Sequence, residues 1–521
     1  MISKPQIKYP IGEQSFELLR SEGYLYVDKT SYIEQIINGS KYYFLGRPRR
    51  FGKSLFLSTL KCFFEGKREL FKGLYADSMD WDWEEYPVLH LDLNISKYNS
   101  EKELDDVIEQ HLLNWEREYD IIPDVSSYSV RFSQILRLIS EKTGKTVVIL
   151  VDEYDKPLVN NIHNPELFNK FRDTLAALYS NFKSGADYIR LVFLTGVSRF
   201  GKLSVFSGLN NISNISFVSE FASICGISEE ELLENFQEGI KALAERQGQT
   251  LEETLDELKH RYDGYHFSKL SPDMYNPYSL LNVFAYKEYS NYWIESGTPR
   301  LLVEQLTRSD ADLVKLMSAR SNEALLSGLD IDNMSAVALL FQTGYLTIKS
   351  YNPRARLFQL GLPNDEVREG FLEYLLPCYS SVKTEEAPEF IYEFRTEIEE
   401  GRVDDFMRRL QSLFSDTSYE MKMDEERNVQ NALFILFRLL GLSVDVEYRT
   451  SQGRIDILVR TDRYVYIMEL KYDRSAEEAL AQIERKEYAL PWAVDSREVI
   501  AIGINFSTAK RTIDSWLIRP L

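Results

Sequence analysis

A basic loop that contains glycine and lies between a strand and a helix constrains the fold of this chain most. Residues 47–54 read RPRRFGKS, after an apolar run at 42–45 and before helical periodicity at 54–64. A loop that joins a strand to a helix N-terminus directs backbone N–H groups at phosphate oxygens. Lys53 would then reach the β- and γ-phosphates, and the Ser54 hydroxyl would ligate Mg²⁺.

The spacing of this loop departs from the usual phosphate-loop pattern. Gly46 lies six positions before Gly52, where the usual pattern has five. An ordinary surface turn with a basic cluster therefore stays an alternative for the loop considered alone.

Two further strands support the phosphate site. Residues 147–151 form a buried apolar run that ends in Asp152 and Glu153. We expect Asp152 to hold the Mg²⁺ shell and Glu153 to polarise the attacking water. The alternative is a strand that simply ends at the surface in acidic residues. Residues 191–194 lead into Ser198 and Arg199, which are candidates for a γ-phosphate contact or else simple loop residues.

Apolar patterning divides the chain into three parts. Short apolar runs separated by helical stretches indicate a parallel sheet with crossover helices in the first two hundred residues; the runs are 42–45, 88–93, 147–151 and 191–194. Helical patterns then follow at 229–247, 251–261, 301–326 and 335–341, with a strand pair within 344–360. Residues 385–414 are charged and helical without a strong apolar face, which predicts a linker or hinge.

Two alternating strands near the C-terminus, at 453–460 and 464–471, carry facing carboxylates. If Asp462 and Arg463 form a two-residue turn, Asp456 lies directly opposite Glu469, and Lys471 points to the same face. Opposed like charges cost energy, so we expect a cation between them, and oxygen ligands favour Mg²⁺ or Mn²⁺. Lys471 would position the water or stabilise the transition state. The alternative is a hairpin with a surface ion pair.

The helices predicted on either side of these strands fit such a site. Glu426 lies in the first turn of a helix at 424–440 and shares a face with Val429 and Leu433, so it points toward the core. Residues 475–478 read as a capping box that begins a helix carrying Gln482. From residue 424 the predicted order is helix, strand, strand, helix, strand.

Charge and composition exclude several classes of protein. The 61 basic and 81 acidic residues give a net charge of −20, which argues against a general DNA-coating role. Residues 420–521 hold 15 basic and 17 acidic residues, so a nucleic acid would approach this part most easily. Three separated cysteines and five unpaired histidines argue against zinc. We expect no signal peptide and no membrane span, and therefore a cytoplasmic protein.

At these motifs the chain resembles bacterial AAA-ATPase-like proteins that carry a C-terminal PD-(D/E)xK nuclease-superfamily domain. The resemblance covers nearly the whole chain and rests on these stretches: YVDKT at 26–30, RPRRFGKS at 47–54, VDEYDKP at 151–157, TGVSRF at 195–200, YDGY at 262–265, YNP at 275–277, QTGYLT at 342–347, GRID at 453–456 and ELK at 469–471. One departure is Val429-Gln430, where the family usually has an aromatic-histidine pair.

The resemblance implies an α/β fold in three parts. These are a P-loop AAA-like ATPase domain with a parallel sheet at 1–220, a mostly helical connector at 221–400, and a small mixed α/β restriction-endonuclease-like domain at 401–521. The resemblance implies ATP binding with Lys53, Ser54, Asp152 and Glu153 in the roles given above, and the further candidates for nucleotide binding are Arg49, Arg50, Gly52 and Arg199. The implied metal ligands are Ser54, Asp152, Asp456 and Glu469. The implied catalytic residues are Glu153, Asp456, Glu469, Lys471, Glu426 and Gln482.

These observations favour an ATP-binding and ATP-hydrolysing protein coupled to a Mg²⁺- or Mn²⁺-dependent nuclease that acts on DNA. One alternative is a nucleotide-switched signalling or scaffold ATPase whose C-terminal domain binds a partner without cleavage. A third is a nucleotide-binding module with little turnover. A homo-oligomer stays open, with Arg199 the candidate arginine finger.

Overall fold

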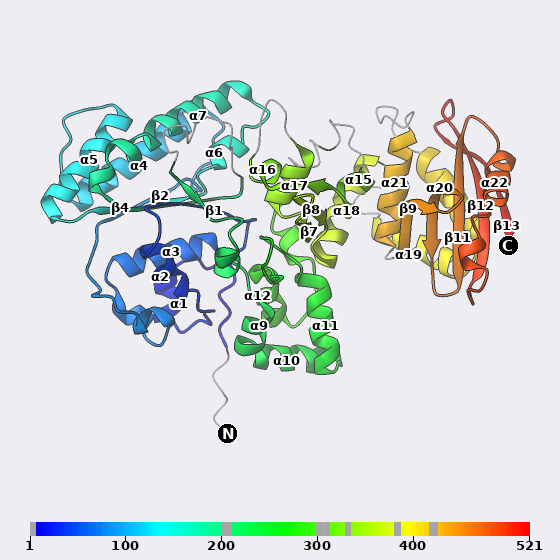
Figure 1. The fold of residues 1–521 in the computed structure, drawn as a ribbon, viewed down its shortest axis with the longest axis horizontal. Coiled ribbons are helices and arrows are strands. Elements are labelled where there is room, and N and C mark those ends of the chain that lie inside the picture. Colours follow the sequence, from blue (N-terminus) through cyan, green and yellow to red (C-terminus); the bar gives the residue numbers. More distant parts are fainter. Residues whose placement is uncertain are drawn as a thin grey trace. The chain divides into compact units, whose positions relative to one another are not determined.

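A computed structural model describes residues 7–198, 211–297, 306, 313–328, 335–379, 387–415, 426–440 and 442–521. The chain divides into two compact units (Figure 1). The first holds residues Met1–Trp293 and Ala319–Glu366, and the second holds Ile294–Ser318 and Val367–Leu521. Each is described by itself below. The division into domains at 1–220, 221–400 and 401–521 stays a prediction.

The first unit is built on an all-parallel sheet, as the apolar runs predict. Its strand order is β2 (Val88–Asp92), β3 (Val147–Asp152), β4 (Ile189–Gly196), β1 (Tyr42–Gly46) and β5 (Ser213–Asn214). One face of the sheet carries α1 (Phe16–Ser21), α2 (Ser31–Ile37) and α3 (Lys53–Phe64), and the other carries α4 (Glu101–Glu118), α5 (Tyr128–Thr143), α6 (Lys156–Val159), α7 (Pro165–Tyr179) and α8 (Asn181–Ser184) (Figure 1). β3 is buried throughout because helices cover both faces.

Parallel pairing brings three strand ends to one edge of this sheet. Gly46 at the end of β1 pairs with Gly196 at the end of β4, and Val151 in β3 pairs with Leu194 in β4. The loop after β1, the acidic residues after β3 and the residues after β4 therefore leave the sheet side by side. Ligands of open α/β sheets bind at such carboxyl ends.

Helices complete the first unit together with a small antiparallel sheet. The helices are α9 (Glu229–Asn235), α10 (Gln237–Gln247), α11 (Leu251–Tyr262), α12 (Pro277–Tyr286), α13 (Tyr292–Glu295), α16 (Glu323–Leu326) and α17 (Ala336–Thr343). The sheet has the order β6 (Arg320–Ser321), β8 (Leu357–Gly361), β7 (Thr347–Asn352), which confirms the predicted strand pair. The pattern at 229–247 is two helices, because Phe236 leaves the helical conformation and packs its ring against Phe284.

The second unit contains a five-stranded mixed sheet. Its strand order is β13 (Thr512–Pro520), β12 (Glu498–Ser507), β11 (Tyr464–Tyr472), β10 (Gly453–Arg460) and β9 (Ser443–Thr450). Its helices are α15 (Leu313–Leu316), α18 (Asp365–Tyr379), α19 (Ala387–Glu399), α20 (Val403–Ser415), α21 (Glu426–Leu439) and α22 (Ala476–Arg485); α13 ends and α18 begins across the boundaries between the units.

The predicted element order after residue 424 and the helical pattern at 301–326 were incomplete. The two edge strands, β9 and β13, were missed because they carry many polar residues, which is typical of edge strands. In the pattern at 301–326, residues Arg320–Ser321 form strand β6, and most of 301–312 lies outside the described residues.

The expected linker at 385–414 is wrong. Residues Val403–Ser415 form α20, which buries one apolar face. Its Phe406 ring meets Tyr466 of β11 edge to face at 5.9 Å, and Gln411 donates a hydrogen bond to Ile513 O of β13. The apolar residues of this helix alternate with charged ones at helical spacing, so counting charges hid the buried face.

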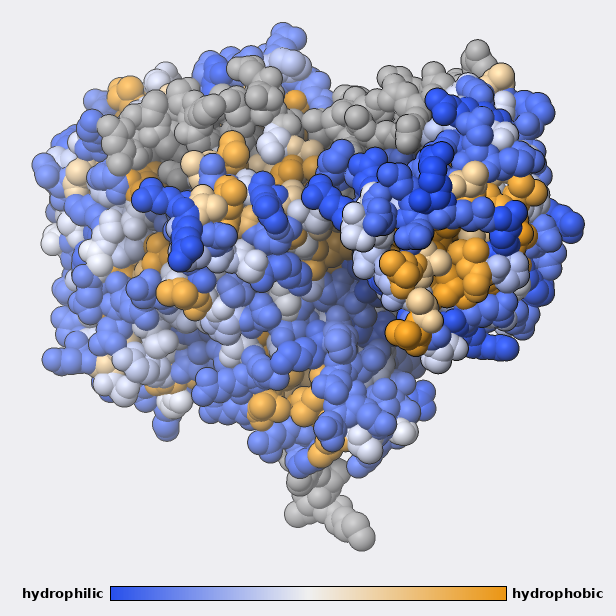
Figure 2. Space-filling model, turned by 45° about the vertical axis from the view of Figure 1, so that its right-hand side comes forward, coloured by the Kyte–Doolittle hydropathy of each residue, from blue (hydrophilic) through white to orange (hydrophobic). Residues whose placement is uncertain are grey.

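Polar side chains dominate the visible surface, with apolar residues in separate patches (Figure 2). None of the helices within the described ranges combines the length and apolarity that a membrane span requires.

Phe406 supplies a test of the corrected position of α20. We expect Phe406→Ala to lower the free energy of unfolding of the second unit by about 3–5 kcal/mol, because a fully buried ring leaves a cavity. Urea unfolding followed by circular dichroism measures the change. Arg408→Ala, at an exposed position of the same helix, is the matched control. A loss below about 1 kcal/mol for Phe406→Ala would contradict the packing.

Candidate nucleotide and metal sites

The loop between β1 and α3 adopts the conformation that a phosphate-binding turn requires. Arg50 and Gly52 have φ values of +66° and +95°, which turn the chain sharply before α3 begins at Lys53. The left-handed conformation at Gly52 costs little because glycine has no Cβ. The N-terminus of a twelve-residue helix therefore faces the space above the sheet edge, where an anion is favoured.

The Lys53 ammonium lies at the centre of this site. Its Nζ is 3.2 Å from Glu153 Oε1 and donates hydrogen bonds to the carbonyl oxygens of Arg47 and Pro48 at 3.1 and 3.2 Å. The side chain is only 3% exposed. Burial alone would lower the pKa of Lys53, but the carboxylates of Glu153 and Asp152 outweigh burial and raise it. The lysine is therefore a fixed cation beneath the loop.

Asp152 and Glu153 occupy the predicted positions at the end of β3. The Thr195 hydroxyl of β4 donates to Asp152 Oδ1 at 2.5 Å, which fixes the carboxylate. Glu153 has a φ of +50°, an uncommon conformation for a residue other than glycine. Strain of this kind persists where the surroundings hold a residue in a required orientation.

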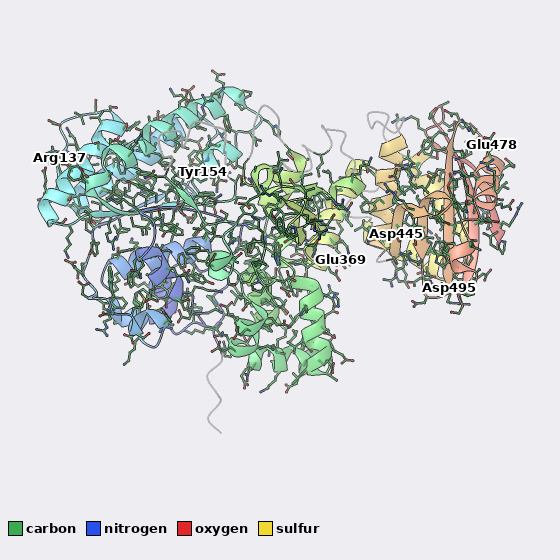
Figure 3. All side chains as sticks on the ribbon, in the orientation of Figure 1. Arg137, Tyr154, Glu369, Asp445, Glu478 and Asp495 are labelled. Atoms are coloured by element: carbon green, nitrogen blue, oxygen red, sulfur yellow. The ribbon has the colours of Figure 1, made fainter. Side chains whose placement is uncertain are left out.

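Asp155 is a site residue to which the sequence assigned no role. It is 1% exposed, and it accepts hydrogen bonds from the Val197 and Ser198 backbone N–H groups. Burial, and next the neighbouring Glu153 charge, raise the pKa of Asp155 to about 7. Tyr154, labelled in Figure 3, donates from its hydroxyl to Ser198 O at 2.9 Å. The segment after β3 is thus tied to the segment after β4.

The other residues predicted for this site are Ser54, Ser198 and Arg199, and the structure describes the first two. Ser54 is the second residue of α3 and half-buried, as a magnesium ligand there would be. Ser198 is buried, and its hydroxyl has no hydrogen-bond partner among the described atoms. Arg199 lies outside the described residues.

The arginines of the loop have separate environments. Arg47 is buried and donates to the carbonyl oxygens of Gly46, Ser216, Phe221 and Ala222, with its guanidinium 4.2 Å from the centre of the Phe267 ring. Desolvation lowers the pKa of Arg47 to about 10. Arg49 and Arg50 lie over the rings of Trp293 and Tyr278, at 5.0 and 4.9 Å. Arg47 therefore holds the loop in place and is not available to a phosphate.

Two cavities flank the loop. One of about 570 Å³ is largely apolar and is lined by Tyr26, Val27, Phe51, Gly52, Ile227 and Pro277, among others. The other, of about 510 Å³, includes Pro48, Ser216, Phe217, His266, Phe341 and Thr347 in its lining. The first borders Gly52, directly before the helix N-terminus.

The second site lies in the mixed sheet of the second unit, where the predicted register is confirmed. Thr461 N–H donates to Tyr464 O across a two-residue turn, and Ile457 pairs with Met468. Continuing this register places Asp456 opposite Glu469. The paired ladder ends at Ile457, however, and the Asp456 carboxylate instead accepts the Leu470 N–H at 2.9 Å. The Asp456 side chain therefore accepts a β11 backbone N–H at the point where the paired β10–β11 ladder has ended.

Strand β10, which carries Asp456, and its neighbour β9 are both distorted at this point. Residues three apart in a regular strand point to opposite faces, yet Ile455 and Leu458 belong to one buried cluster. On β9, Glu447 faces Asp456 in the register and has a φ of +57°. Distortions of this kind re-aim side chains next to active sites, and no sequence signal predicted this one.

Glu469 is 1% exposed and has one oxygen engaged and one free for a ligand. Its Oε1 accepts hydrogen bonds from Lys471 Nζ, at 3.0 Å, and from Gln482 Nε2 of α22. Its Oε2 has no hydrogen-bond partner among the described atoms. Burial, and next the Asp456 charge, raise the pKa of Glu469 to about 7. A buried carboxylate oxygen without a partner, beside a second carboxylate, fits a divalent cation.

The flanking helices agree with the sequence where they are described. Glu426 is the first residue of α21, and its side chain lies outside the description, whereas Val429 and Leu433 are buried as predicted. Ser475 caps α22 by accepting the Glu478 N–H. Figure 3 shows Glu478 and Asp495 at opposite ends of this unit. Among the described residues, no three His, Cys, Asp or Glu side chains gather as a complete metal site, so Asp456 and Glu469 would need water or substrate oxygens as further ligands.

The raised pKa of Glu469 predicts how Mn²⁺ binding depends on pH. A proton and a metal compete for this carboxylate, so we expect affinity at this site to fall about tenfold per pH unit below 7 and to level off above it. Calorimetric titration between pH 5.5 and 8.5 measures this, with Asp152→Asn used as background to silence the other candidate metal site. An affinity independent of pH across this range would contradict it.

Comparisons with known proteins identify two kinds of domain in the chain. The family described as "Predicted AAA-ATPase" matches residues 10–206, and the family described as "PD-(D/E)XK nuclease superfamily" matches residues 424–516. A protein of Azotobacter chroococcum mcd 1, described as "Uncharacterized protein in vnfD 5'region", is 34% identical over 537 residues, and the alignment covers 99% of each chain. The chain therefore belongs to the family of predicted AAA-ATPases that carry a C-terminal PD-(D/E)XK nuclease-superfamily domain.

Proposed function

We propose that this protein binds and hydrolyses ATP at the edge of its parallel sheet and cleaves DNA phosphodiesters at the Asp456–Glu469 site. The observation that carries the proposal is the buried Glu469 carboxylate, whose oxygen Oε2 has no hydrogen-bond partner among the described atoms, next to the half-buried Asp456 and to Lys471. A cation would stabilise this set, because burying a carboxylate oxygen without a partner costs free energy.

At the nucleotide site, four residues would share the work of phosphoryl transfer: Lys53, Ser54, Asp152 and Glu153. Lys53 would exchange its carbonyl and Glu153 partners for the β- and γ-phosphate oxygens. Ser54 and Asp152 would hold Mg²⁺, which neutralises charge that develops on the phosphates. Glu153, released from Lys53, would orient and polarise the attacking water. The cavity next to Gly52 has the apolar lining that would suit the base.

At the nuclease site, the residues divide into ligands and positioning groups. Asp456 and Glu469 would hold Mg²⁺ or Mn²⁺, whose chemistry is to activate a water and stabilise charge on the scissile phosphate. Lys471, held 3.0 Å from Glu469, would orient the attacking water or stabilise the transition state. Gln482 keeps Glu469 in place, and Glu426 would contribute from α21.

The proposal extends to the partner and the setting. DNA would approach the second unit, since residues 420–521 are close to neutral while the chain as a whole carries −20. The absence of any readout motif in the sequence favours cleavage without sequence specificity. We propose that the protein is cytoplasmic and needs no membrane. We also propose a homo-oligomer, in which Arg199 would act as an arginine finger.

Glu153→Gln tests the nucleotide site. We expect ATP binding to be retained and hydrolysis to fall about 10²–10⁴-fold, because the amide no longer polarises water. Phosphate release and fluorescent-nucleotide binding measure the two effects. Glu141→Gln, in an exposed ion pair of α5, is the matched control. Equal hydrolysis in wild type and Glu153→Gln would contradict the assigned role and favour a nucleotide-binding module with little turnover.

Lys471→Ala tests the nuclease site. We expect cleavage of labelled DNA with Mn²⁺ to fall about 10²–10³-fold while Mn²⁺ binding persists, because the lysine acts on water or phosphate and is not a ligand. Lys510→Ala, at an exposed ion pair of the same unit, is the control. If wild-type protein cuts neither DNA nor RNA while ATP hydrolysis is intact, the C-terminal domain is a partner-binding module and the nuclease proposal fails.

A further inference from the structure

The chain passes between its two units at several points, and the residues at two of these points, Trp293 and Glu366, are hydrogen-bonded to each other. It leaves the first unit after Trp293 and again after Glu366. The Trp293 backbone N–H donates to Glu366 Oε1 at 2.6 Å, and both residues are 0% exposed. The other oxygen of Glu366 accepts from the Ser279 hydroxyl of α12 at 2.8 Å. Two of the crossing points are thus joined inside the first unit.

This pair is attached directly to the phosphate loop. The Trp293 indole N–H donates to the Arg49 carbonyl oxygen at 3.1 Å, and the Arg49 guanidinium lies over the same indole ring. Gly344, at the end of α17, leaves no room for a side chain, because a Cβ there would lie 2.8 Å from Pro48 Cβ and 3.4 Å from the Trp293 ring. The loop and the tryptophan therefore cannot move independently without opening close contacts.

Phosphate binding changes the bonds that hold this part of the loop. In the structure, Lys53 Nζ donates to the carbonyl oxygens of Arg47 and Pro48, the two residues before Arg49. A γ-phosphate that takes up the ammonium removes donors from those carbonyls. The next carbonyl along the chain, that of Arg49, is the one held by Trp293. Binding of a phosphate would therefore change the hydrogen bonding of the carbonyl groups directly before Arg49, whose own carbonyl oxygen accepts the indole hydrogen bond.

The residues that follow each member of the pair in the sequence are packed within the second unit. Ile294 follows Trp293 and is buried against Gly370 of α18, where a Cβ would come within 2.5 Å of Ile294 Cγ2. Val367 follows Glu366 and is also fully buried. One peptide bond separates each member of the Trp293–Glu366 pair from packed residues of the other unit.

We propose that Trp293 and Glu366 are positioning residues that couple the phosphate loop to α18 of the second unit. The proposal rests on the proposed function only in taking ATP as the ligand of the loop. The two residues act through the Arg49 carbonyl and touch neither the nucleotide nor the scissile phosphate. The element that carries this coupling is the buried, hydrogen-bonded pair Trp293–Glu366. Changes at the phosphate loop and changes at α18 would both shift its conformational equilibrium, as coupling between distant sites requires.

Hydrogen exchange with mass spectrometry tests this on the full chain, with Glu153→Gln as background to preserve ATP. We expect ATP to slow exchange in residues 46–54 and to change exchange in Asp365–Tyr379 by about five-fold or more. In Trp293→Phe, which keeps a ring but loses the indole N–H, the loop response should remain and the α18 response should fall below about twofold. Trp115→Phe, at a buried position of α4, is the matched control and should behave as its parent.

The outcomes separate this inference from the proposed function. Absence of ATP protection in the loop of the parent protein contradicts the nucleotide proposal itself. Protection of the loop with no change in α18, or an α18 response that survives Trp293→Phe, overturns the coupling. If Trp293→Phe does not fold, Glu366→Gln, which preserves shape but removes the charge, provides the same readout. DNA cleavage is not needed for any of these results.

Discussion

The ion pair between Lys53 and Glu153 is the interaction on which the N-terminal site depends. Lys53 begins the helix that follows β1, and Glu153 follows β3; parallel pairing of both strands with β4 brings the two groups together, and the lysine is buried beneath carbonyl oxygens of its own loop. Such a pair is expensive to desolvate unless other partners complete it. The same principle applies in the second unit, where Glu469 is buried beside the half-buried Asp456 and Lys471 contacts only one of its oxygens. In both places a charged ligand would relieve the imbalance.

Short sequence patterns predicted those elements whose structure depends mainly on residues that are close together in the sequence. Apolar runs indicated the parallel strands, and the turn at Asp462-Arg463 fixed the register that brings Asp456 toward Glu469. The edge strands β9 and β13 and the buried face of α20 were missed because polar residues obscured their apolar periodicity. Asp155, and the contact from Trp293 to an oxygen 244 residues away, depend on tertiary pairing and have no local signature.

The two sites differ in how completely the chain alone forms them. The nucleotide site has its cation, its helix N-terminus and its carboxylates in place, with Thr195 and Asp155 fixing the acidic segment. The metal site has two carboxylates that would require additional oxygen ligands from water or a phosphate. A site completed by its substrate would suit control by nucleotide through the proposed role of Trp293 and Glu366.

The proposal of a nucleotide-controlled nuclease is tested most directly by cleavage of labelled DNA and RNA with Mn²⁺, with and without ATP, using wild type, Asp456→Ala and Lys53→Ala. It predicts cutting of DNA that is lost in Asp456→Ala, and an effect of ATP on wild type that is lost in Lys53→Ala. Cutting that persists in Asp456→Ala would contradict the site. No cutting by wild type that still hydrolyses ATP would contradict the nuclease and identify a switch protein whose C-terminal domain binds without cleaving.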